Sequence, residues 1–419
     1  MNENSRLARA SGVYKTIAII TFSSVALFAF LNLVVYAWSE ISAHLKKSES
    51  QNQINEWYGN DIDLTSVYPD LSMDQINEML GEIWNRPYAY RAYTQFCERP
   101  FRGKYVNVSD VGFRGNGREL VWPPNYDTDF VIFVFGGSTT FGYGLPDSQT
   151  VPAHLERNLN SRSPKRAVKV YNFGCGYHFS TQERVLFECL IADKHLPHLA
   201  VFIDGFNDFS QADYGDPRFT YDLGLYLDDR CQEIWTNSGR ITMGRAFRNL
   251  VDSLPVSAPL GVRMSLAGRA PPPRKRFAPD VLFSKIIDRY VTNKKLAKLV
   301  ADGSGVKTLF VWQPISGYKY DRKHDLFGRF GLGKHAICAK GYPAMAQYVS
   351  THDMGKDFLW CADMQEQMAE ALYVDRFHYT NKLAGLLAAK IADEIRARFV
   401  DLRRPLVDSA VPCVNEPRG

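Results

Sequence analysis

The chain has 419 residues, of which 45% are hydrophobic and 23% charged, and its formal net charge is +5. This composition supplies enough apolar side chains for a sizeable core and excludes a disordered chain. Lysine and arginine are not gathered into one stripe, as a nucleic-acid-binding surface requires, so we expect no nucleic-acid partner. The seven cysteines include no CxxC pair, and we expect neither a metal nor a cofactor.

Residues 16–38 (TIAIITFSSVALFAFLNLVVYAW) form an uncharged apolar run that is long enough to cross a bilayer as a helix. Tyr36 and Trp38, at its end, suit the lipid–water interface. Three basic residues precede the run and two follow it, and this slight excess favours a cytoplasmic amino end. We therefore expect a single-pass inner-membrane protein, with residues 1–15 in the cytoplasm and the rest of the chain in the periplasm. The alternative is a buried core helix.

Residues 39–125 are interpreted as a stem and an N-terminal accessory region. The first part is polar and favours helix, with an amphipathic stretch in SMDQINEMLGEIW. Residues 86–125 are rich in Tyr, Arg, Gly and Pro, and contain two strand-like pieces around KYVNVS and GFRGN. The aromatic side chains of residues 86–105 are candidates for stacking on sugar rings.

Apolar strands alternate with helices over residues 126–400. Strands are expected in FVIFVFGG, KVYNFGCG, HLAVFIDGFND and VKTLFVWQP, and helices in VPAHLERNLNSR, STQERVLFECLIADK, residues 280–305 and NKLAGLLAAKIADEIRARF. This alternation predicts an α/β domain whose parallel sheet carries helices on both faces. Residues 210–280 interrupt it with the basic, proline-rich APPPRKRFAP and are interpreted as an insertion or lid, and residues 401–419 as a tail.

The first predicted strand ends in Gly136-Gly137-Ser138. Glycines allow a sharp turn, and a serine at the following helix start lies where free N–H groups favour a developing anion. No lysine follows at the position that a phosphate-binding Walker motif needs. Ser138 is therefore either a nucleophile or a small residue in a tight turn.

The second predicted strand ends at Asn172-Phe-Gly-Cys-Gly176. Gly176, or its neighbour Tyr177, can offer a backbone N–H to an oxyanion. Ser180 and Glu183 have the spacing of a capping box, so we expect Ser180 to cap the next helix. Cys175 is expected to be a small packed residue and not a nucleophile.

Two further motifs carry polar side chains that suit catalysis. Asn207 lies in GFND, where its amide can serve as a rigid oxyanion donor or can simply end the strand in an Asx-turn. Asp375 and His378 lie in DRFH before the last predicted helix, and residues three apart on one turn can meet. Such a carboxylate would hold the tautomer of the imidazole.

Together these four segments resemble the motifs of the SGNH hydrolases, also called the GDSL family of esterases and lipases. The resemblance covers about residues 128–398; GFND and DRFH match in full, whereas the first block reads GGS where the family usually has GDS. It implies a flavodoxin-like three-layer α/β/α sandwich with Ser138 as nucleophile, His378 as base and Asp375 as its partner. It also implies an oxyanion hole made by the N–H groups of Ser138 and Gly176 and the side chain of Asn207.

The GGSTTFGYG form resembles that of a membrane-attached bacterial branch of the family. The resemblance implies a serine esterase that removes acetyl or other short acyl groups from a carbohydrate or cell-envelope substrate. An O-acyltransferase with the same residues and a non-catalytic envelope-binding module are the alternatives. Glycine at 137 preserves the backbone turn, and we expect Thr139 or Thr140 to replace the hydrogen bonds of the missing aspartate. The oligomeric state is left open.

Overall fold

The computed structural model describes residues 3–58, 62–118, 121–161, 166–210 and 278–398. The predicted tail at 401–419 and nearly all of the predicted insertion at 210–280 lie outside these residues. The chain divides into two compact units, Met1–Asn52 with Thr220–Arg274 and Gln53–Phe219 with Lys275–Gly419. The sheet and the candidate site lie in the second unit.

Helix α1 (Glu3–Tyr58) contains the apolar run. Its segment Ser11–Trp38 has a mean hydropathy of 2.3 and is long and apolar enough to cross a membrane. Only 6% of its most apolar window is buried, so the buried-core-helix interpretation does not fit. The one amide in this run, Asn32, donates to the carbonyl of Phe28 one turn earlier (2.9 Å), which satisfies one of its donors within the helix.

The centre of the second unit is a five-stranded parallel sheet. The strands are β5 (Asp129–Gly136), β6 (Ala167–Asn172), β7 (Leu199–Asp204), β8 (Lys307–Trp312) and β9 (Phe358–Trp360). Their order is β6-β5-β7-β8-β9, and every neighbouring pair is parallel. This is the flavodoxin-like order, in which ligands bind at the carboxyl edge of the sheet, near the point where the strand order reverses. The predicted fold class is confirmed; the short strand β9 was not predicted.

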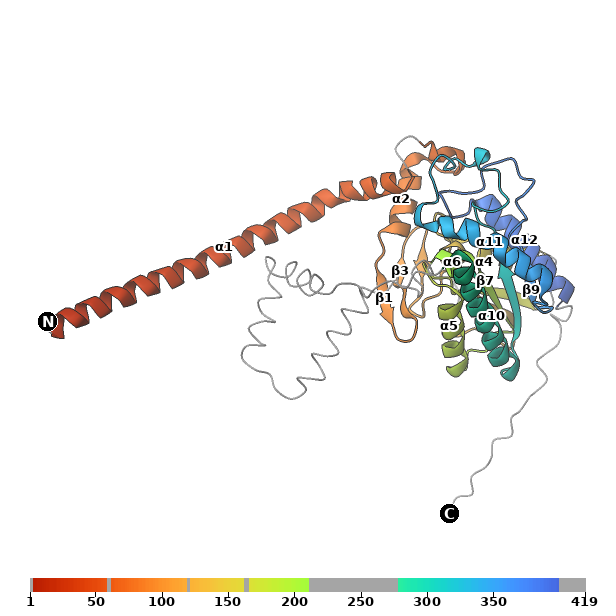
Figure 1. Cartoon of the computed structure of the whole chain (residues 1–419), viewed down its shortest axis with the longest axis horizontal. Coiled ribbons are helices and arrows are strands. Elements are labelled where there is room, and N and C mark those ends of the chain that lie inside the picture. Colours follow the sequence, from red (N-terminus) through yellow and green to blue (C-terminus); the bar gives the residue numbers. More distant parts are fainter. Residues whose placement is uncertain (1–2, 59–61, 119–120, 162–165, 211–277, 399–419) are drawn as a thin grey trace, which may run out of the picture. The chain divides into compact units, whose positions relative to one another are not determined.

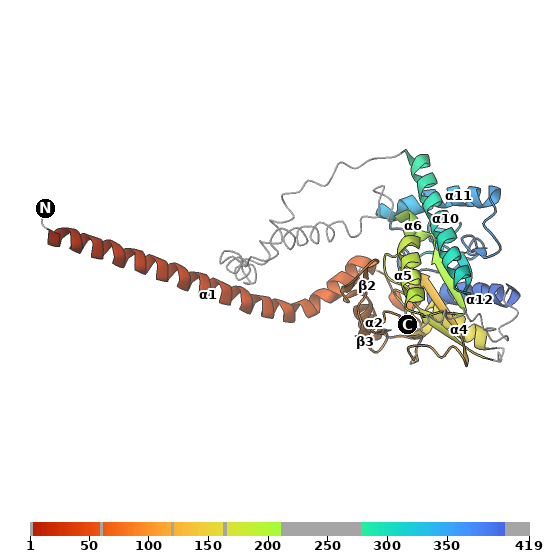
Figure 2. The ribbon, with the colours of Figure 1, turned by 90° about the horizontal axis from the view of Figure 1, so that it is seen from below.

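Helices cover both faces of this sheet (Figures 1 and 2). α4 (Val151–Asn160) and α12 (Asn381–Arg398) pack on one face, and α5 (Ser180–Ala192) and α10 (Pro279–Gly303) on the other. Along β5, Ile132 and Val134 face the first pair, whereas Val131, Phe133 and Phe135 face the second, because side chains alternate along a strand. The helix α11 (Ala336–Thr351), which was not predicted, packs on α6 (Phe206–Ser210).

The accessory region, defined here as residues 62–118, packs on this α/β core. It contains the short 3-10 helix η1 (Leu64–Ser66), the helix α2 (Met73–Trp84), the antiparallel hairpin of β1 (Tyr88–Arg91) and β2 (Gln95–Glu98), and the pair β3 (Phe101–Arg102) and β4 (Asn107–Val108). Ser72 caps α2 in a capping box with Gln75. The apolar face of α2 lies in one cluster with Phe141, Tyr143 and Val374, so α2 is not a free-standing stem.

Candidate active site

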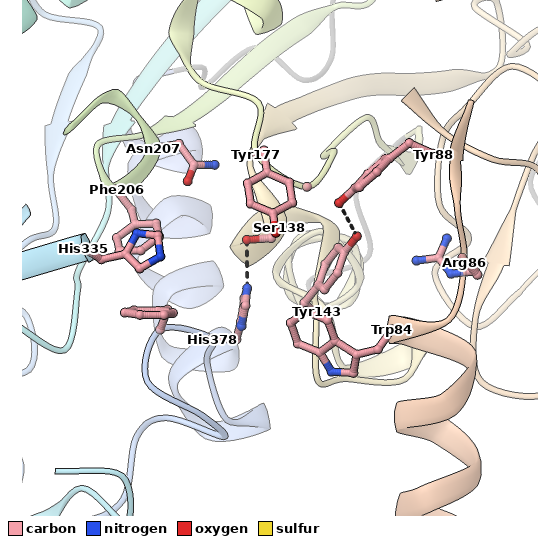
Figure 3. Close-up of a pocket in the computed structure, with 12 residues that line it drawn as sticks. Trp84, Arg86, Tyr88, Ser138, Tyr143, Tyr177, Phe206, Asn207, His335 and His378 are labelled. Atoms are coloured by element: carbon pink, nitrogen blue, oxygen red, sulfur yellow. Dashed lines mark hydrogen bonds between the residues drawn. The ribbon is translucent and has the colours of Figure 1, made fainter. Parts of the chain in front are cut away.

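Three side chains meet where β5 ends (Figure 3 shows two of them). Ser138 is the first residue of α3 (Ser138–Phe141), and its Oγ lies 2.8 Å from Nε2 of His378, 240 positions later. Nδ1 of His378 lies 2.6 Å from Oδ2 of Asp375. Because a carboxylate accepts the Nδ1 proton, Nε2 is left as an acceptor for the serine hydroxyl. The imidazole can therefore take a proton from Ser138.

The Asp375–His378 turn is held by its own hydrogen bonds. Oδ1 of Asp375 accepts from the backbone N–H groups of Phe377 and His378, both at 2.8 Å. The N–H of Val374 donates to the carbonyl of His378 (2.9 Å) and closes the turn. Burial by itself would raise the pKa of Asp375, but the charge of His378 and these hydrogen bonds outweigh burial and lower it. Asp375 thus remains a carboxylate beside the imidazole.

Two aromatic rings enclose the imidazole of His378, which is 5% exposed. Tyr143 stacks on it (ring centroids 5.6 Å apart, interplanar angle 23°), and Trp84 meets it edge-on (5.7 Å, 70°). The indole N–H of Trp84 donates to the hydroxyl of Tyr58 (3.0 Å), which fixes the ring. These two contacts hold the plane of the imidazole between Ser138 and Asp375.

Gly137, where the family usually has aspartate, is required by its neighbours. A Cβ at this position would lie 2.3 Å from Nδ2 of Asn207 and 3.1 Å from the carbonyl oxygen of His178. The turn is secured from the next residues, as expected, because Thr139 Oγ1 donates to Oε1 of Gln313 at 2.7 Å. No such bond is found for Thr140 among the described residues. The missing side chain therefore makes room for the amide of Asn207.

Asn207 lies in α6, directly after β7, and lines the same pocket as Ser138 (Figure 3). Its Nδ2 donates to the carbonyl oxygen of His178 at 2.7 Å. A side-chain amide has two N–H donors, so one of them is available to a bound group. The hydrogen bond to His178 fixes the plane of the amide.

The prediction for Gly176 is corrected by the structure. Its N–H donates to Oε1 of Glu98 (3.0 Å), a buried carboxylate that β2 brings in from the accessory region. An N–H that points at a carboxylate oxygen does not point at the site of an oxyanion. Glycine is needed here for space, because a Cβ would lie 2.1 Å from the hydroxyl of Tyr88 and 2.9 Å from that of Tyr143. Cys175, next to it, is a buried thiol whose pKa is raised by burial, in keeping with a packed residue.

The predicted capping box at Ser180 is also wrong. Phe179 occupies the N-cap position, and its backbone N–H donates to Oε1 of Gln182 (3.3 Å). The hydroxyl of Ser180 donates instead to Oδ1 of Asp208 at 2.6 Å. Glu183 is buried as well, near Asp204 and Asp208, so neither Ser180 nor Glu183 is placed at the exposed end of the helix.

The loop after α3 is locked by a buried arginine. Arg114 is fully buried and pairs through Nε with Oδ1 of Asp147 at 2.8 Å. Its Nη1 donates to the carbonyls of Phe141 and Gly142, and its Nη2 donates to the carbonyl of Leu145. Burial lowers the pKa of this guanidinium, and Asp147 compensates for the buried charge. The segment that follows Ser138 is thereby fixed.

Ser138, Asn207 and His378 line a cavity of about 250 Å³. One wall comes from the accessory region, which supplies Trp84, Arg86 and Tyr88 (Figure 3). Tyr177, Phe206, His335 and Phe377 complete the rim. Sequence reasoning missed Trp84, Arg86 and Glu98, because no motif marks them; the aromatic content of residues 86–105 was the one available signal. In the part of the chain that the structure describes, no three His, Cys, Asp or Glu side chains form a metal-binding group.

No protein-family model matches the sequence, and the search of curated proteins gives no match. Among solved structures, the chain is similar to a G-D-S-L family protein from Desulfitobacterium hafniense described as lipolytic (11% identity, 64% of this chain and 99% of that chain, TM-score 0.33). It is also similar to Est24, a carbohydrate acetylesterase from Sinorhizobium meliloti (14%, 64% and 98%, TM-score 0.31), and to the lipase Lip_vut3 from a goat rumen metagenome (10%, 63% and 97%, TM-score 0.37). These TM-scores are low, so the function proposed next rests on the side-chain geometry of this chain.

Proposed function

We propose that the chain is a serine esterase in which Ser138 is the nucleophile, His378 the general base and Asp375 its partner. The observation that carries the proposal is the imidazole of His378, which lies within hydrogen-bond distance of Ser138 Oγ on one side and of the Asp375 carboxylate on the other. A nucleophile, a base and a group that orients the base, all within such reach, are what covalent acyl transfer needs.

The reaction follows from these distances. His378 takes the proton of Ser138 as Oγ attacks the ester carbonyl, and Asp375 stabilises the imidazolium that results. The imidazolium then gives its proton to the departing alkoxide, which leaves an acyl group on Ser138. Water, deprotonated by the same imidazole, attacks the acyl group, and the imidazolium returns this proton to Oγ of Ser138 as the acid is released.

The negative charge on the tetrahedral oxygen needs donors close to Ser138. The backbone N–H of Ser138 and the remaining amide hydrogen of Asn207 are the two donors that we assign to it. The Gly176 N–H is not included, since Glu98 accepts it. Loss of one such donor typically raises the barrier by about 2.7–4 kcal/mol.

For the substrate we propose a short acyl ester, in the first place an acetyl ester, on a carbohydrate or another cell-envelope molecule. The pocket is small, and its partly exposed rim carries the rings of Trp84, Tyr88 and Tyr177. Aromatic rings with a polar tip suit ligands that have both apolar faces and hydroxyl groups. We further propose that Ser11–Trp38 anchors the protein in the inner membrane, with the α/β core in the periplasm.

The test uses the full chain in detergent with p-nitrophenyl acetate and longer acyl esters. Ser138→Ala is expected to abolish turnover and labelling by a fluorophosphonate, whereas Ser161→Ala, at an exposed helix end, retains both. Equal rates for wild type and Ser138→Ala would rule out the esterase. Transfer of acetyl to added oligosaccharides, in place of release to water, would indicate the acyltransferase. A reporter at the carboxyl terminus tests the periplasmic placement.

A further inference from the structure

The carboxylate of Glu98 joins two parts of the site from outside the α/β core. Glu98 ends β2 and is 2% exposed. Its Oε1 accepts both the N–H of Gly176 (3.0 Å) and the hydroxyl of Tyr143 (3.1 Å). Its Oε2 lies 3.2 Å from Nη1 of Arg86, whose side chain is 4% exposed. A buried carboxylate needs such partners, and here all three belong to residues that line the candidate active site.

Gly176 begins the turn that holds Asn207. β2 contacts this turn at two points, since the carbonyl of Phe96 also lies 3.1 Å from Nε2 of His178. Burial lowers the pKa of His178 to about 4, so the neutral ring can donate one N–H to that carbonyl. The carbonyl of His178 in turn accepts from Nδ2 of Asn207. The position of the Asn207 amide, which is proposed to bind the oxyanion, thus depends on how β2 holds residues 176–178.

Tyr143 forms the second connection. Its ring stacks on the imidazole of His378, and its hydroxyl donates to Glu98. The hydroxyl of Tyr88 lies 2.8 Å from that of Tyr143 and adds a second restraint (Figure 3). The tilt of the Tyr143 ring over the imidazole is therefore set at its hydroxyl end by Glu98.

We propose that Glu98 is a positioning residue for the esterase reaction: it orients the Asn207 amide through residues 176–178 and the His378 imidazole through Tyr143. The inference rests on the proposed function. Its physical reason is that reacting groups must be held within a fraction of an ångström, and the misplacement of a donor by about 1 Å can cost about 100-fold in rate. Arg86 balances the charge of Glu98, which would otherwise oppose the negative charge developing at Ser138.

The experiment compares Glu98→Ala and Glu98→Gln in the full chain, by kcat and KM on p-nitrophenyl acetate and by Tm. Glutamine keeps one oxygen for Gly176 and Tyr143 but loses the charge that pairs with Arg86. The matched control is Glu82→Ala, which removes a carboxylate of the same region that accepts backbone N–H groups at Lys104, Tyr105 and Val106, away from the pocket.

We expect Glu98→Ala to lower kcat about 100-fold with KM within about threefold, and Glu98→Gln to recover kcat to within about tenfold of wild type at a similar loss in Tm. Glu82→Ala should lower Tm without this change in kcat. A kcat for Glu98→Ala within threefold of wild type, or an equal loss of kcat in the glutamine variant, would overturn the inference.

If Glu98→Ala does not fold, Tyr143→Phe decides the matter, because it keeps the stacked ring and removes only the hydroxyl that Glu98 accepts. A kcat about tenfold lower at unchanged KM supports the inference, and an unchanged kcat overturns it. The kinetics of the Glu98 variants test this inference only if the wild-type chain hydrolyses the ester and Ser138→Ala abolishes that activity. Absence of that turnover would instead contradict the proposed function itself.

Discussion

The α/β core places Ser138 and Asn207 directly after the neighbouring strands β5 and β7, whereas the accessory region places Trp84 and Glu98 beside them by packing alone. In the core, the topology of the sheet decides where these side chains lie, because parallel strands end at one edge. In the accessory region, the apolar face of α2 and the β1–β2 hairpin decide it. The groups proposed to react thus come from the core, and the accessory region contributes groups that shape and support the pocket.

The largest expected effect tests the core. Asp375→Asn should lower kcat about 10⁴-fold, because the amide no longer holds the imidazole tautomer in which Nε2 is unprotonated. Steady-state kinetics on p-nitrophenyl acetate measure this. Asp302→Asn, at an exposed surface pair with Lys298, is the control. A loss of less than tenfold for Asp375→Asn would remove Asp375 from its assigned role.

The next test concerns the accessory region. Leu80, in α2, is fully buried, and Leu80→Ala should lower the free energy of unfolding by about 2–5 kcal/mol, as expected for a cavity in a shared core. Leu387, in α12, is also fully buried, and Leu387→Ala should shift the same urea unfolding transition to lower urea concentration. Leu299→Ala, 68% exposed, should change stability by less than about 0.5 kcal/mol. Two separate transitions would show that the accessory region folds apart from the core.

Gly137→Ala tests the contact between the nucleophile turn and Asn207. The added Cβ would displace the Asn207 amide, and we expect kcat to fall about 100-fold. Gly303→Ala is the matched control, since a Cβ there has no neighbour within 4 Å. Activity of Gly137→Ala close to that of wild type would mean that the Asn207 amide need not lie where the structure has it.

The smallest expected effect is a pH dependence of stability within the core. Burial, followed by the nearby charges of Asp204 and Asp208, raises the pKa of Glu183. The folded state therefore keeps a proton that the unfolded chain releases above its ordinary pKa of 4.5, and stability falls as the pH rises.

Glu183→Gln should thus be more stable than wild type at pH 8, and the difference should shrink as the pH is lowered to 4. Tm measured across this range tests the sign. Glu188→Gln removes an acid from the surface of the same helix, where it pairs with Arg184, and serves as the control. If the Tm advantage of Glu183→Gln over wild type grew as the pH was lowered, the raised pKa of Glu183 would be contradicted.

Much of the core was predictable because its signals are local. Apolar runs of strand length and amphipathic runs of helix length alternate from β5 to α12, and this pattern predicts a parallel sheet with two helical layers. The strand β9 was missed because it has three residues, and α11 because its glycine and internal proline obscure its period. At Ser180 the capping-box spacing was misleading, since the hydroxyl donates to Asp208 in α6, the helix that follows β7.

The sequence by itself determined the fold class and identified Ser138, Asn207, Asp375 and His378 as candidates, because each lies at a strand end or in a short motif next to a helix. Only the tertiary structure decided that Ser138, His378 and Asp375 form one hydrogen-bonded series, and that Gly176 gives its N–H to Glu98. It alone showed that Gly137 leaves space for an amide. The physical reason is that hydrogen bonds and contacts between residues tens to hundreds of positions apart depend on packing, which leaves no periodic or short-range pattern in the chain.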